Sequence, residues 1–254
     1  MAVIWGVILH ALGGFASGSF YLPYKKVKGW SWESYWLVGG IVSWVFAPWI
    51  MGSLTVHNLL GVLGQADNTT LLWTYLWGVL WGFGGLTFGL AMRYLGLSLG
   101  MAVTLGLCAV FGTLVPPLWL GTLPALAHSA SGQMILIGLV VCVLGILVCG
   151  LAGIMKEKSL TTEQKTATIA EFDLRKGILV AVFSGVMSAC MSFGLTAGQP
   201  IAELARLNGT PELFMNNAIL VVILAGGLTT NAAWCIYLNI KNKTYTDYLN
   251  PTLP

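Results

Sequence analysis

The chain alternates between long apolar segments and short polar ones. Seven stretches stay apolar for about 20 residues, the length that an α-helix needs to cross a bilayer core about 30 Å thick. They are 3–22, 34–54, 71–92, 97–120, 133–153, 177–200 and 214–238. Because lipid offers backbone N–H and C=O groups no hydrogen-bond partners, each stretch is predicted to be helical. The pattern predicts an all-α, polytopic membrane helix bundle.

Composition supports this fold class. Only 8% of the 254 residues are charged, against about 25% in soluble domains. A water-soluble globule could not cover its surface with so few charges, which argues against a cytoplasmic enzyme or a nucleic-acid binder. The five cysteines lie inside apolar runs without metal-ligand spacing, and there is no phosphate-binding loop. The sequence therefore predicts no metal, no cofactor and no enzymatic activity.

The basic residues predict the orientation of the spans. Eleven of the twelve lie in connections on one side, and only Arg206 lies on the other. The eleven are Lys25, Lys26, Lys28, Arg93, Lys156, Lys158, Lys165, Arg175, Lys176, Lys241 and Lys243. The positive-inside rule places the N-terminus outside and the tail after 214–238 in the cytoplasm. The polar stretch 155–176 is then a cytoplasmic linker, too short to form a core of its own.

Two short similarities indicate an internal repeat. GGFASGSF (13–20) aligns with SGVMSACMSF (184–193), and LVGGIVSW (37–44) aligns with LAGGLTTN (224–231). The paired helices run in opposite directions, as in transporters built from inverted repeats. We expect residues 1–154 to be the first five-helix repeat and residues 177–254 to begin a second, incomplete one. On this interpretation three spans are missing and the chain is truncated.

Small residues and prolines mark several spans. Glycines recur at i and i+4, as at Gly78 and Gly82, and favour close helix packing. Pro48 and the pair Pro116–Pro117 interrupt 34–54 and 97–120, which frees backbone carbonyls. Such kinks suit a gate, but static bundles have them too.

Two ionisable residues are candidates for a proton site. His10 lies within the first span, where it either carries a proton or makes a neutral hydrogen bond between helices. Glu33 stands at the predicted inner mouth of 34–54. It either pairs with nearby lysines in an inner gate or favours the positive end of the helix dipole. Lys26 and Arg93 are the candidate gate partners, although Arg93 is more simply a positive-inside anchor.

An aromatic row and a few polar side chains suggest a sugar site. Tryptophans recur at i, i+4 and i+8 on one face of 71–92, and Trp81 lies deepest. The row is Trp73, Trp77 and Trp81. Flat aromatic faces bind the apolar C–H surface of a sugar, while amides and hydroxyls meet its hydroxyl groups. Ser17, Ser192 and Asn231 are the candidate polar partners, and the alternative for each is an interhelical hydrogen bond.

Three segments carry a family resemblance: FYLPYKKVKGWSWESYWLVGGIVSWVFAPW (20–49), MRYLGLSLGMAVTLG (92–106) and EFDLRKGILVAVFSGVMSACMSF (171–193). The sequence resembles the bacterial L-rhamnose–proton symporter family, a branch of the drug/metabolite transporter superfamily, up to about residue 240. The resemblance implies about ten spans in two inverted five-helix halves, with the last three absent here. His10 also fits the family pattern.

The resemblance further implies alternating-access import of a deoxyhexose, L-rhamnose or a similar sugar, through the bacterial cytoplasmic (inner) membrane. The proton would be the coupling ion, and the partners would be the sugar and the lipid bilayer. None of the seven spans has a carboxylate at mid-membrane, so coupling would fall to His10 or Glu33 or to the missing part. The alternatives are a superfamily relative that moves another small metabolite and an integral-membrane protein that transports nothing.

Overall fold

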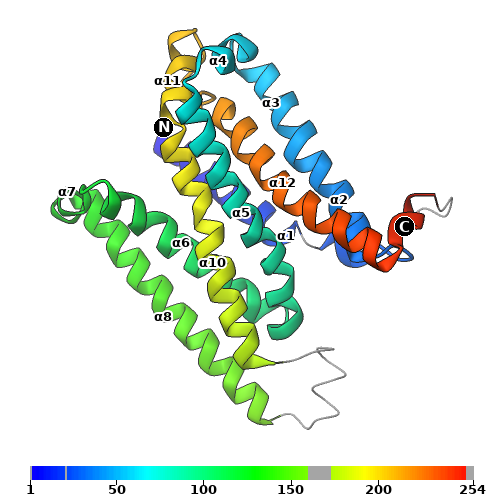
Figure 1. Cartoon of the computed structure of the whole chain (residues 1–254). Helices are drawn as coiled ribbons and strands as arrows, with labels where there is room; N and C mark the ends of the chain where they lie inside the picture. The colour runs from blue at the N-terminus through cyan, green and yellow to red at the C-terminus, as the bar shows by residue number, and fades with distance from the viewer. Residues whose placement is uncertain (1, 21, 160–172, 250–254) are drawn as a thin grey trace. The chain divides into compact units, whose positions relative to one another are not determined.

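The structure is a computed structural model of the whole chain, and it describes residues 2–20, 22–159 and 173–249. Every regular element within these ranges is helical (Figure 1). Six helical segments among them are long and apolar enough to cross a membrane: Trp32–Thr55, Asn68–Leu95, Ser98–Trp119, Ala130–Met155, Leu174–Ala197 and Asn217–Asn242. The prediction of an all-α, polytopic membrane bundle is confirmed.

The described helices are α1 (Ala2–Ser19), η1 (Pro23–Lys26), α2 (Trp32–Ile41), η2 (Val42–Phe46), α3 (Ala47–Thr55), α4 (Leu59–Gln65), α5 (Asn68–Leu95), α6 (Leu97–Trp119), α7 (Leu123–His128), α8 (Ala130–Ser159), α10 (Leu174–Ala197), α11 (Gln199–Leu207), α12 (Asn217–Asn242) and η3 (Thr244–Leu249). The short helices α4, α7 and α11 fall in connections that the hydrophobic pattern leaves as loops. Helices α8 and α10 take up both ends of the predicted linker 155–176, and residues 160–172 lie outside the described ranges.

The first predicted span differs from the other six. The stretch 3–22 was expected to be helical throughout, but α1 ends at Ser19. Pro23 has no N–H to donate to the Ser19 carbonyl, which instead accepts a hydrogen bond from the Leu22 N–H at 3.0 Å in a tighter turn. The apolar part of α1, Ile4–Ser19, is therefore shorter than the six long helices.

Pro48 reshapes its helix without breaking it. The turn before it, η2, is π-helical, and the Ala47 N–H bonds to the carbonyl of Val42, five residues back. A proline ring clashes with the carbonyl four residues earlier and cannot donate to it, so a wider turn accommodates the ring. The prolines of α6, Pro116 and Pro117, likewise lie inside a helix that continues to Trp119.

The chain forms two compact units, one of residues 1–39 with 233–254 and one of residues 40–232. Helix directions within the second unit follow from residue contacts. Gly84 of α5 lies against Ser188 of α10, and the Asp173 N–H donates to the Tyr94 carbonyl at 3.3 Å, so α5 and α10 are antiparallel.

The same kind of contact orients the other long helices of this unit. Helices α5 and α12 are parallel, with Gly78 against Ile223 and Gly82 against Gly227. Helix α3 is antiparallel to α12, since Thr55 accepts a hydrogen bond from Asn217 at 2.8 Å and Gly52 faces Val221. This is the alternation that consecutive membrane crossings require, and it gives the segments 34–54 and 214–238 the opposed directions predicted for them.

Glycines bring α5, α10 and α12 into close contact (Figure 1). A Cβ atom added at Gly78 would collide with the carbonyl of Ile223, and one added at Gly84 would lie 2.6 Å from the backbone nitrogen of Ser188. Small residues permit this approach, and polar side chains then bond across it. The Ser184 hydroxyl donates to the Gly84 carbonyl at 2.9 Å, and the Thr230 hydroxyl donates to the Val79 carbonyl at 2.8 Å.

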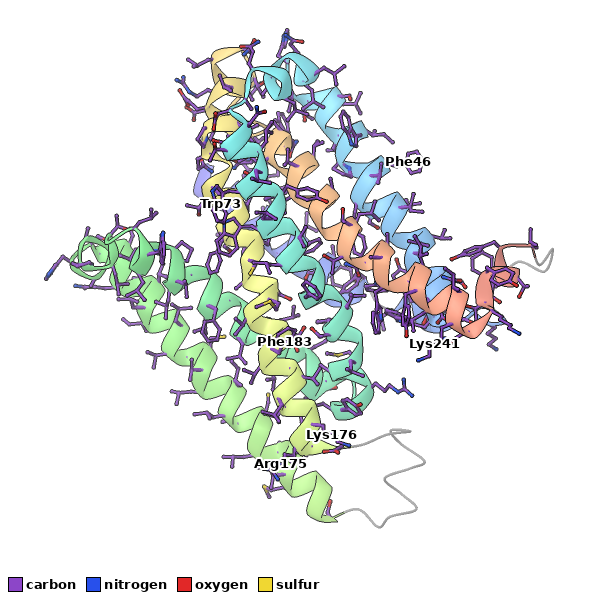
Figure 2. All side chains as sticks on the ribbon, viewed as in Figure 1. Phe46, Trp73, Arg175, Lys176, Phe183 and Lys241 are labelled. Carbon is purple, nitrogen blue, oxygen red and sulfur yellow. The ribbon has the colours of Figure 1, made fainter. Side chains whose placement is uncertain are left out.

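Much of the outer surface is apolar, as a membrane protein requires. Phe46, Trp73 and Phe183 are about half exposed on the helices that carry them (Figure 2). Helix α8 has the most apolar of the six long segments, and no residue of its most apolar window is buried. The hydrophobic effect would forbid such a surface in water, so these faces fit a lipid environment.

Candidate functional site

Glu33 stands in the first turn of α2 and is held by the end of α12. Its side chain is 6% exposed. Its Oε1 atom accepts hydrogen bonds of 2.9 Å from the Asn242 amide and from the Thr244 hydroxyl. Both partners are neutral donors, so this carboxylate is held by hydrogen bonds rather than by a cation at these positions.

A second layer of polar side chains surrounds this group. The Asn239 Oδ1 atom accepts hydrogen bonds from Ser34 at 3.1 Å and from Thr244 at 3.2 Å. The Asn239 amide donates to the Cys235 carbonyl at 2.9 Å and to the Tyr248 hydroxyl at 3.2 Å. The start of α2, the end of α12 and η3 are thus joined by one network, which we call the Glu33 network: Glu33, Ser34, Asn239, Asn242 and Thr244.

Asp247 of η3 binds the backbone at the start of α2. Its Oδ2 atom accepts a hydrogen bond of 2.8 Å from the Ser31 N–H. This bond to the ionised form holds the pKa of Asp247 below its ordinary value. A carboxylate at a helix N-terminus also interacts favourably with the helix dipole, so Asp247 fixes where α2 begins.

The other gate and proton candidates are at the surface of the described chain. Lys26 ends η1 and is exposed, and Arg93 is exposed in the last turn of α5. His10 and Ser17 lie on α1, whose described side chains are almost all exposed. The partners that the structure gives to the Glu33 carboxylate are Asn242 and Thr244.

Two sugar-site candidates, Trp81 and Asn231, lie together where α5 and α12 pack. Asn231 is 1% exposed, and its amide donates to the carbonyls of Gly82 at 3.1 Å and Gly227 at 2.9 Å. The Trp81 ring lies over Gly227, and it makes an edge-to-face contact with Trp44 at 5.9 Å between ring centroids. The interhelical hydrogen bond considered for Asn231 is present.

Ser192, the remaining candidate, lies elsewhere, at the contact of α10 with α6. Its hydroxyl is 2.9 Å from the position that a Cβ atom would take at Gly112. The structure therefore gathers Trp81 and Asn231 at one interface and places Ser192 at another.

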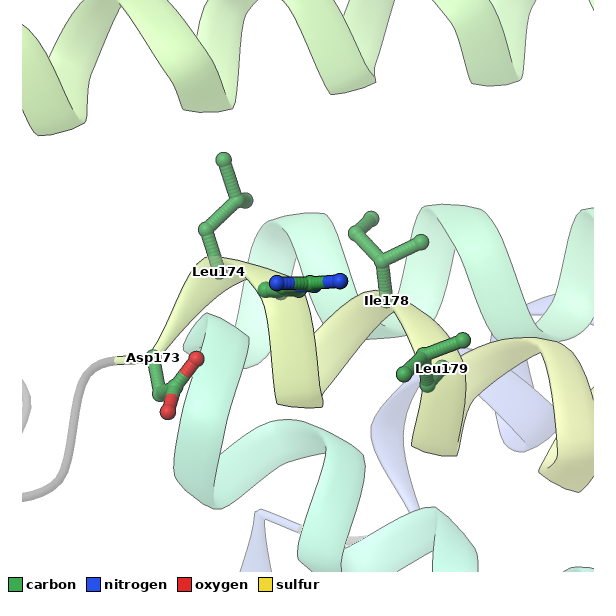
Figure 3. Close-up of a pocket in the computed structure, with 5 residues that line it drawn as sticks. Asp173, Leu174, Ile178 and Leu179 are labelled. Atoms are coloured by element: carbon green, nitrogen blue, oxygen red, sulfur yellow. The ribbon is translucent and has the colours of Figure 1, made fainter.

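A shallow pocket of about 490 Å³ opens at the start of α10 (Figure 3). Asp173 lies at its edge and caps the helix by accepting a hydrogen bond of 3.0 Å from the Lys176 N–H. That bond, together with the nearby Lys176 ammonium, lowers the pKa of Asp173. The rest of the lining is Leu174, Arg175, Ile178 and Leu179, and none of these is a predicted site residue.

The sequence reasoning singled out Glu33 but missed the residues that hold it. Asn239, Asn242 and Thr244 follow Glu33 by more than 200 positions, and no spacing rule connects them. Their only local signal is the polar run that ends the last apolar segment. Among the described residues no group of three or more His, Cys, Asp or Glu side chains could hold a metal ion.

Comparison with known proteins gives the family. Residues 1–247 match the family described as L-rhamnose-proton symport protein (RhaT). The chain belongs to the L-rhamnose-proton symporter family. This family consists of transporters, not enzymes, and the six long apolar helices agree with a multi-pass membrane protein.

Individual relatives agree with the family match. The L-rhamnose-proton symporters of Salmonella paratyphi B and Salmonella newport are each 38% identical to this chain over 234 residues, and so is that of Salmonella enteritidis. The aligned part covers 92% of this chain and 67% of each relative. No solved structure matches the chain.

Proposed function

We propose that this protein imports L-rhamnose, or a similar deoxyhexose, together with a proton by alternating access. Membership of a symporter family carries the proposal, because relatives 38% identical over 92% of the chain are L-rhamnose-proton symporters. We place the protein in the bacterial inner membrane, with its N-terminus outside and the end of α12 in the cytoplasm. The distribution of the lysines and arginines supports this orientation.

We assign the proton to Glu33, with His10 as the second candidate. Glu33 is a buried carboxylate at the edge of an apolar segment, where the charged form is costly unless it is hydrogen-bonded. The amide of Asn242 and the hydroxyl of Thr244 supply those bonds. A group that is buried, ionisable and held by neutral donors can exchange its proton without breaking an ion pair. His10, by contrast, is exposed on α1 in the part of the chain that the structure describes.

Protonation of Glu33 would loosen α2 from the end of α12. Hydrogen bonds to an ionised acceptor are roughly twice as strong as those between neutral groups. Neutralising the carboxylate would therefore weaken the bonds from Asn242 and Thr244 together. The proton can drive the transport cycle only through such a difference between two conformations. Lys26 and Arg93 remain candidate gate residues on the same side of the membrane.

The sugar would lie near Trp81, with Asn231, Ser192 and Ser17 as candidate polar contacts. For Trp81 and Asn231 this placement is supported by the structure, where the Trp81 ring and the buried Asn231 amide lie at the same helix contact. Ser192 and Ser17 rest on the sequence pattern alone.

Uptake of labelled L-rhamnose into proteoliposomes tests the proposal. With the outside more acidic than the lumen, the full chain should accumulate the sugar, and a protonophore should abolish the accumulation. Uptake that ignores the pH gradient would remove the proton from the cycle. Competition with an excess of unlabelled sugars and other small metabolites separates a rhamnose carrier from a relative with a different substrate.

A further inference from the structure

A cleft of about 350 Å³ lies between α5, α6 and α10, and none of the residues that line it belongs to the Glu33 network. One tryptophan of α5, the end of α6 and the last two turns of α10 form its walls. The lining residues are Trp77, Val115, Pro116, Trp119, Leu120, Phe193, Thr196 and Ala197. This volume is at the lower end of the range for small-molecule sites, which suits a ligand the size of a single sugar ring.

The inner wall of the cleft is aromatic. The rings of Trp77 and Phe193 meet edge to face, with 5.1 Å between their centroids and 78° between their planes. Both side chains are half-buried, and this contact fixes their orientation. Trp119, which is 88% exposed, stands at the rim. The cleft therefore offers two aromatic rings packed against each other and a third, Trp119, that is exposed beside them.

A hydrogen-bonding group lies on this wall. On α10 the exposed Thr196 hydroxyl donates to the Ser192 carbonyl at 2.9 Å, which leaves the oxygen of Thr196 able to accept. A ligand hydroxyl could thus find an acceptor on an otherwise apolar surface.

We propose that this cleft is a binding subsite for the deoxyhexose, with Trp77 and Phe193 as the surface on which the sugar stacks. The proposal rests on the proposed function, because the substrate class comes from there. A deoxyhexose has an apolar C–H face and a methyl group in place of one hydroxymethyl group. It also has hydroxyls around its edge, which matches an aromatic wall that carries the hydroxyl of Thr196.

The position of the cleft indicates its place in the transport cycle. Within the 40–232 unit, Trp77 and Thr196 lie toward the ends of α5 and α10 that are opposite Arg93 and Lys176. With the positive residues inside, the cleft faces the outer half of the membrane. It is therefore the first subsite that a sugar entering from outside would meet. An acyl chain is the competing occupant, and it would offer the Thr196 oxygen no hydrogen-bond donor.

Protection of an introduced thiol tests binding directly. Thr196→Cys places a thiol on the cleft wall, and Leu72→Cys places one on an exposed part of α5 outside the cleft. Labelling with N-ethylmaleimide is measured in membranes with and without saturating L-rhamnose, against the unmodified chain as the background for the native cysteines. Rhamnose should slow labelling at position 196 at least fivefold and leave position 72 unchanged.

Uptake kinetics give a second measurement. Trp77→Ala and Phe193→Ala should raise the half-saturating rhamnose concentration about tenfold, which corresponds to about 1.4 kcal/mol. Trp77→Phe should retain most of the affinity because it keeps an aromatic face. Phe83→Ala is the matched control, since Phe83 is an aromatic residue of the same helix α5, is 44% exposed and does not line the cleft.

The possible outcomes separate the subsite from the proposed function. If rhamnose protects position 196 and only the cleft variants lose affinity, the subsite is supported. If the full chain accumulates rhamnose but neither protection nor a change in half-saturation is seen, the subsite is wrong and the symport proposal stands. If the full chain does not accumulate rhamnose, the protection assay still decides the cleft, because binding needs no proton gradient. Labelling that rhamnose leaves unchanged would then refute the subsite as well.

Discussion

The side-chain amide of Asn231 on α12 donates a hydrogen bond of 3.1 Å to the backbone carbonyl of Gly82 on α5. The same amide also bonds to the Gly227 carbonyl within its own helix. One buried side chain therefore ties two parallel helices together at a place where both are lined by glycine. Loss of the amide would leave these contacts unmade in an environment that water does not reach.

We predict that Asn231→Ala lowers the free energy of unfolding by about 1–3 kcal/mol, the usual effect of removing a buried hydrogen-bonding partner. Thermal unfolding in detergent, with and without L-rhamnose, measures this change and also tests the sugar role. If Asn231 only joins helices, rhamnose should raise the melting temperatures of the variant and of the wild type equally. If Asn231 binds the sugar, rhamnose should no longer raise the melting temperature of the variant.

The glycine contact between α5 and α12 gives a second prediction. Gly78→Ala would drive a methyl group into the Ile223 carbonyl, so we expect destabilisation of about 1–3 kcal/mol. Gly138→Ala is the control, because Gly138 lies inside α8 with no atom within 4 Å of the added methyl. Alanine is the better helix former, so this control should be neutral or more stable. Equal melting temperatures for the two variants would contradict the close contact.

At two buried hydroxyls we predict that a substitution raises the free energy of unfolding. Thr74 and Thr104 are 0% exposed, and their Oγ1 atoms have no hydrogen-bond partner among the described residues. Thr→Val at either position removes an unsatisfied polar group and keeps the shape, so we expect a gain of about 1 kcal/mol. Thr230→Val should instead lose about 1 kcal/mol, since Thr230 donates to the Val79 carbonyl at 2.8 Å. The changes appear as melting temperatures that move in opposite directions.

For the proton site, we predict that Glu33→Gln abolishes rhamnose accumulation driven by a pH gradient. The amide can still accept hydrogen bonds from Asn242 and Thr244 but cannot take up a proton. With one proton per sugar, a gradient of one pH unit supports about tenfold accumulation, because one pH unit is worth about 1.36 kcal/mol. The variant should reach a ratio of about 1 and still exchange labelled for unlabelled sugar.

His10→Gln provides the matched comparison for that experiment. It should accumulate rhamnose as the unmodified chain does if Glu33 carries the proton. Loss of accumulation in His10→Gln, with normal accumulation in Glu33→Gln, would transfer the role to His10.

Asp247 predicts how stability depends on pH. Its pKa is lowered in the folded protein because the Ser31 N–H binds the ionised form. The contribution to stability is therefore fully present above the unfolded pKa, about 3.9. It is lost as the pH falls through the lower folded pKa. Asp247→Asn should cost about 1 kcal/mol at neutral pH. The difference in melting temperature from the wild type should shrink below pH 4, and a difference that stayed constant with pH would contradict this role.

The hydrophobic pattern predicts the long helices well because their cause is local. A run of apolar residues must satisfy its own backbone in lipid, whatever lies around it. The spans 71–92 and 97–120 accordingly agree with α5 and α6 to within three residues at each end. The π-turn before Pro48 and the end of α1 at Ser19 depend on the geometry of one proline each, which a hydropathy window averages away.

The surroundings of Glu33 could not be predicted in the same way. The sequence places this carboxylate at the mouth of a span and offers lysines as neighbours. The structure supplies Asn242 and Thr244, which are 209 and 211 residues away along the chain. Amides and hydroxyls near helix ends are common, so nothing marks these two before the helices are packed. The helical packing role of Asn231, by contrast, could be anticipated from a lone amide in an apolar run.

The glycine contacts also limit how this protein can move. At Gly78 and Gly226 the atoms nearest to an added Cβ are all main-chain atoms of the facing helix, α12 or α5, and at Gly84 they include the main chain of Ser188 on α10. A shift of one helix along another would push a carbonyl into an α-carbon, so the three helices must travel as a single piece. One helix can slide along another only where flexible side chains separate them, as Ile146 of α8 does against Gly106 of α6.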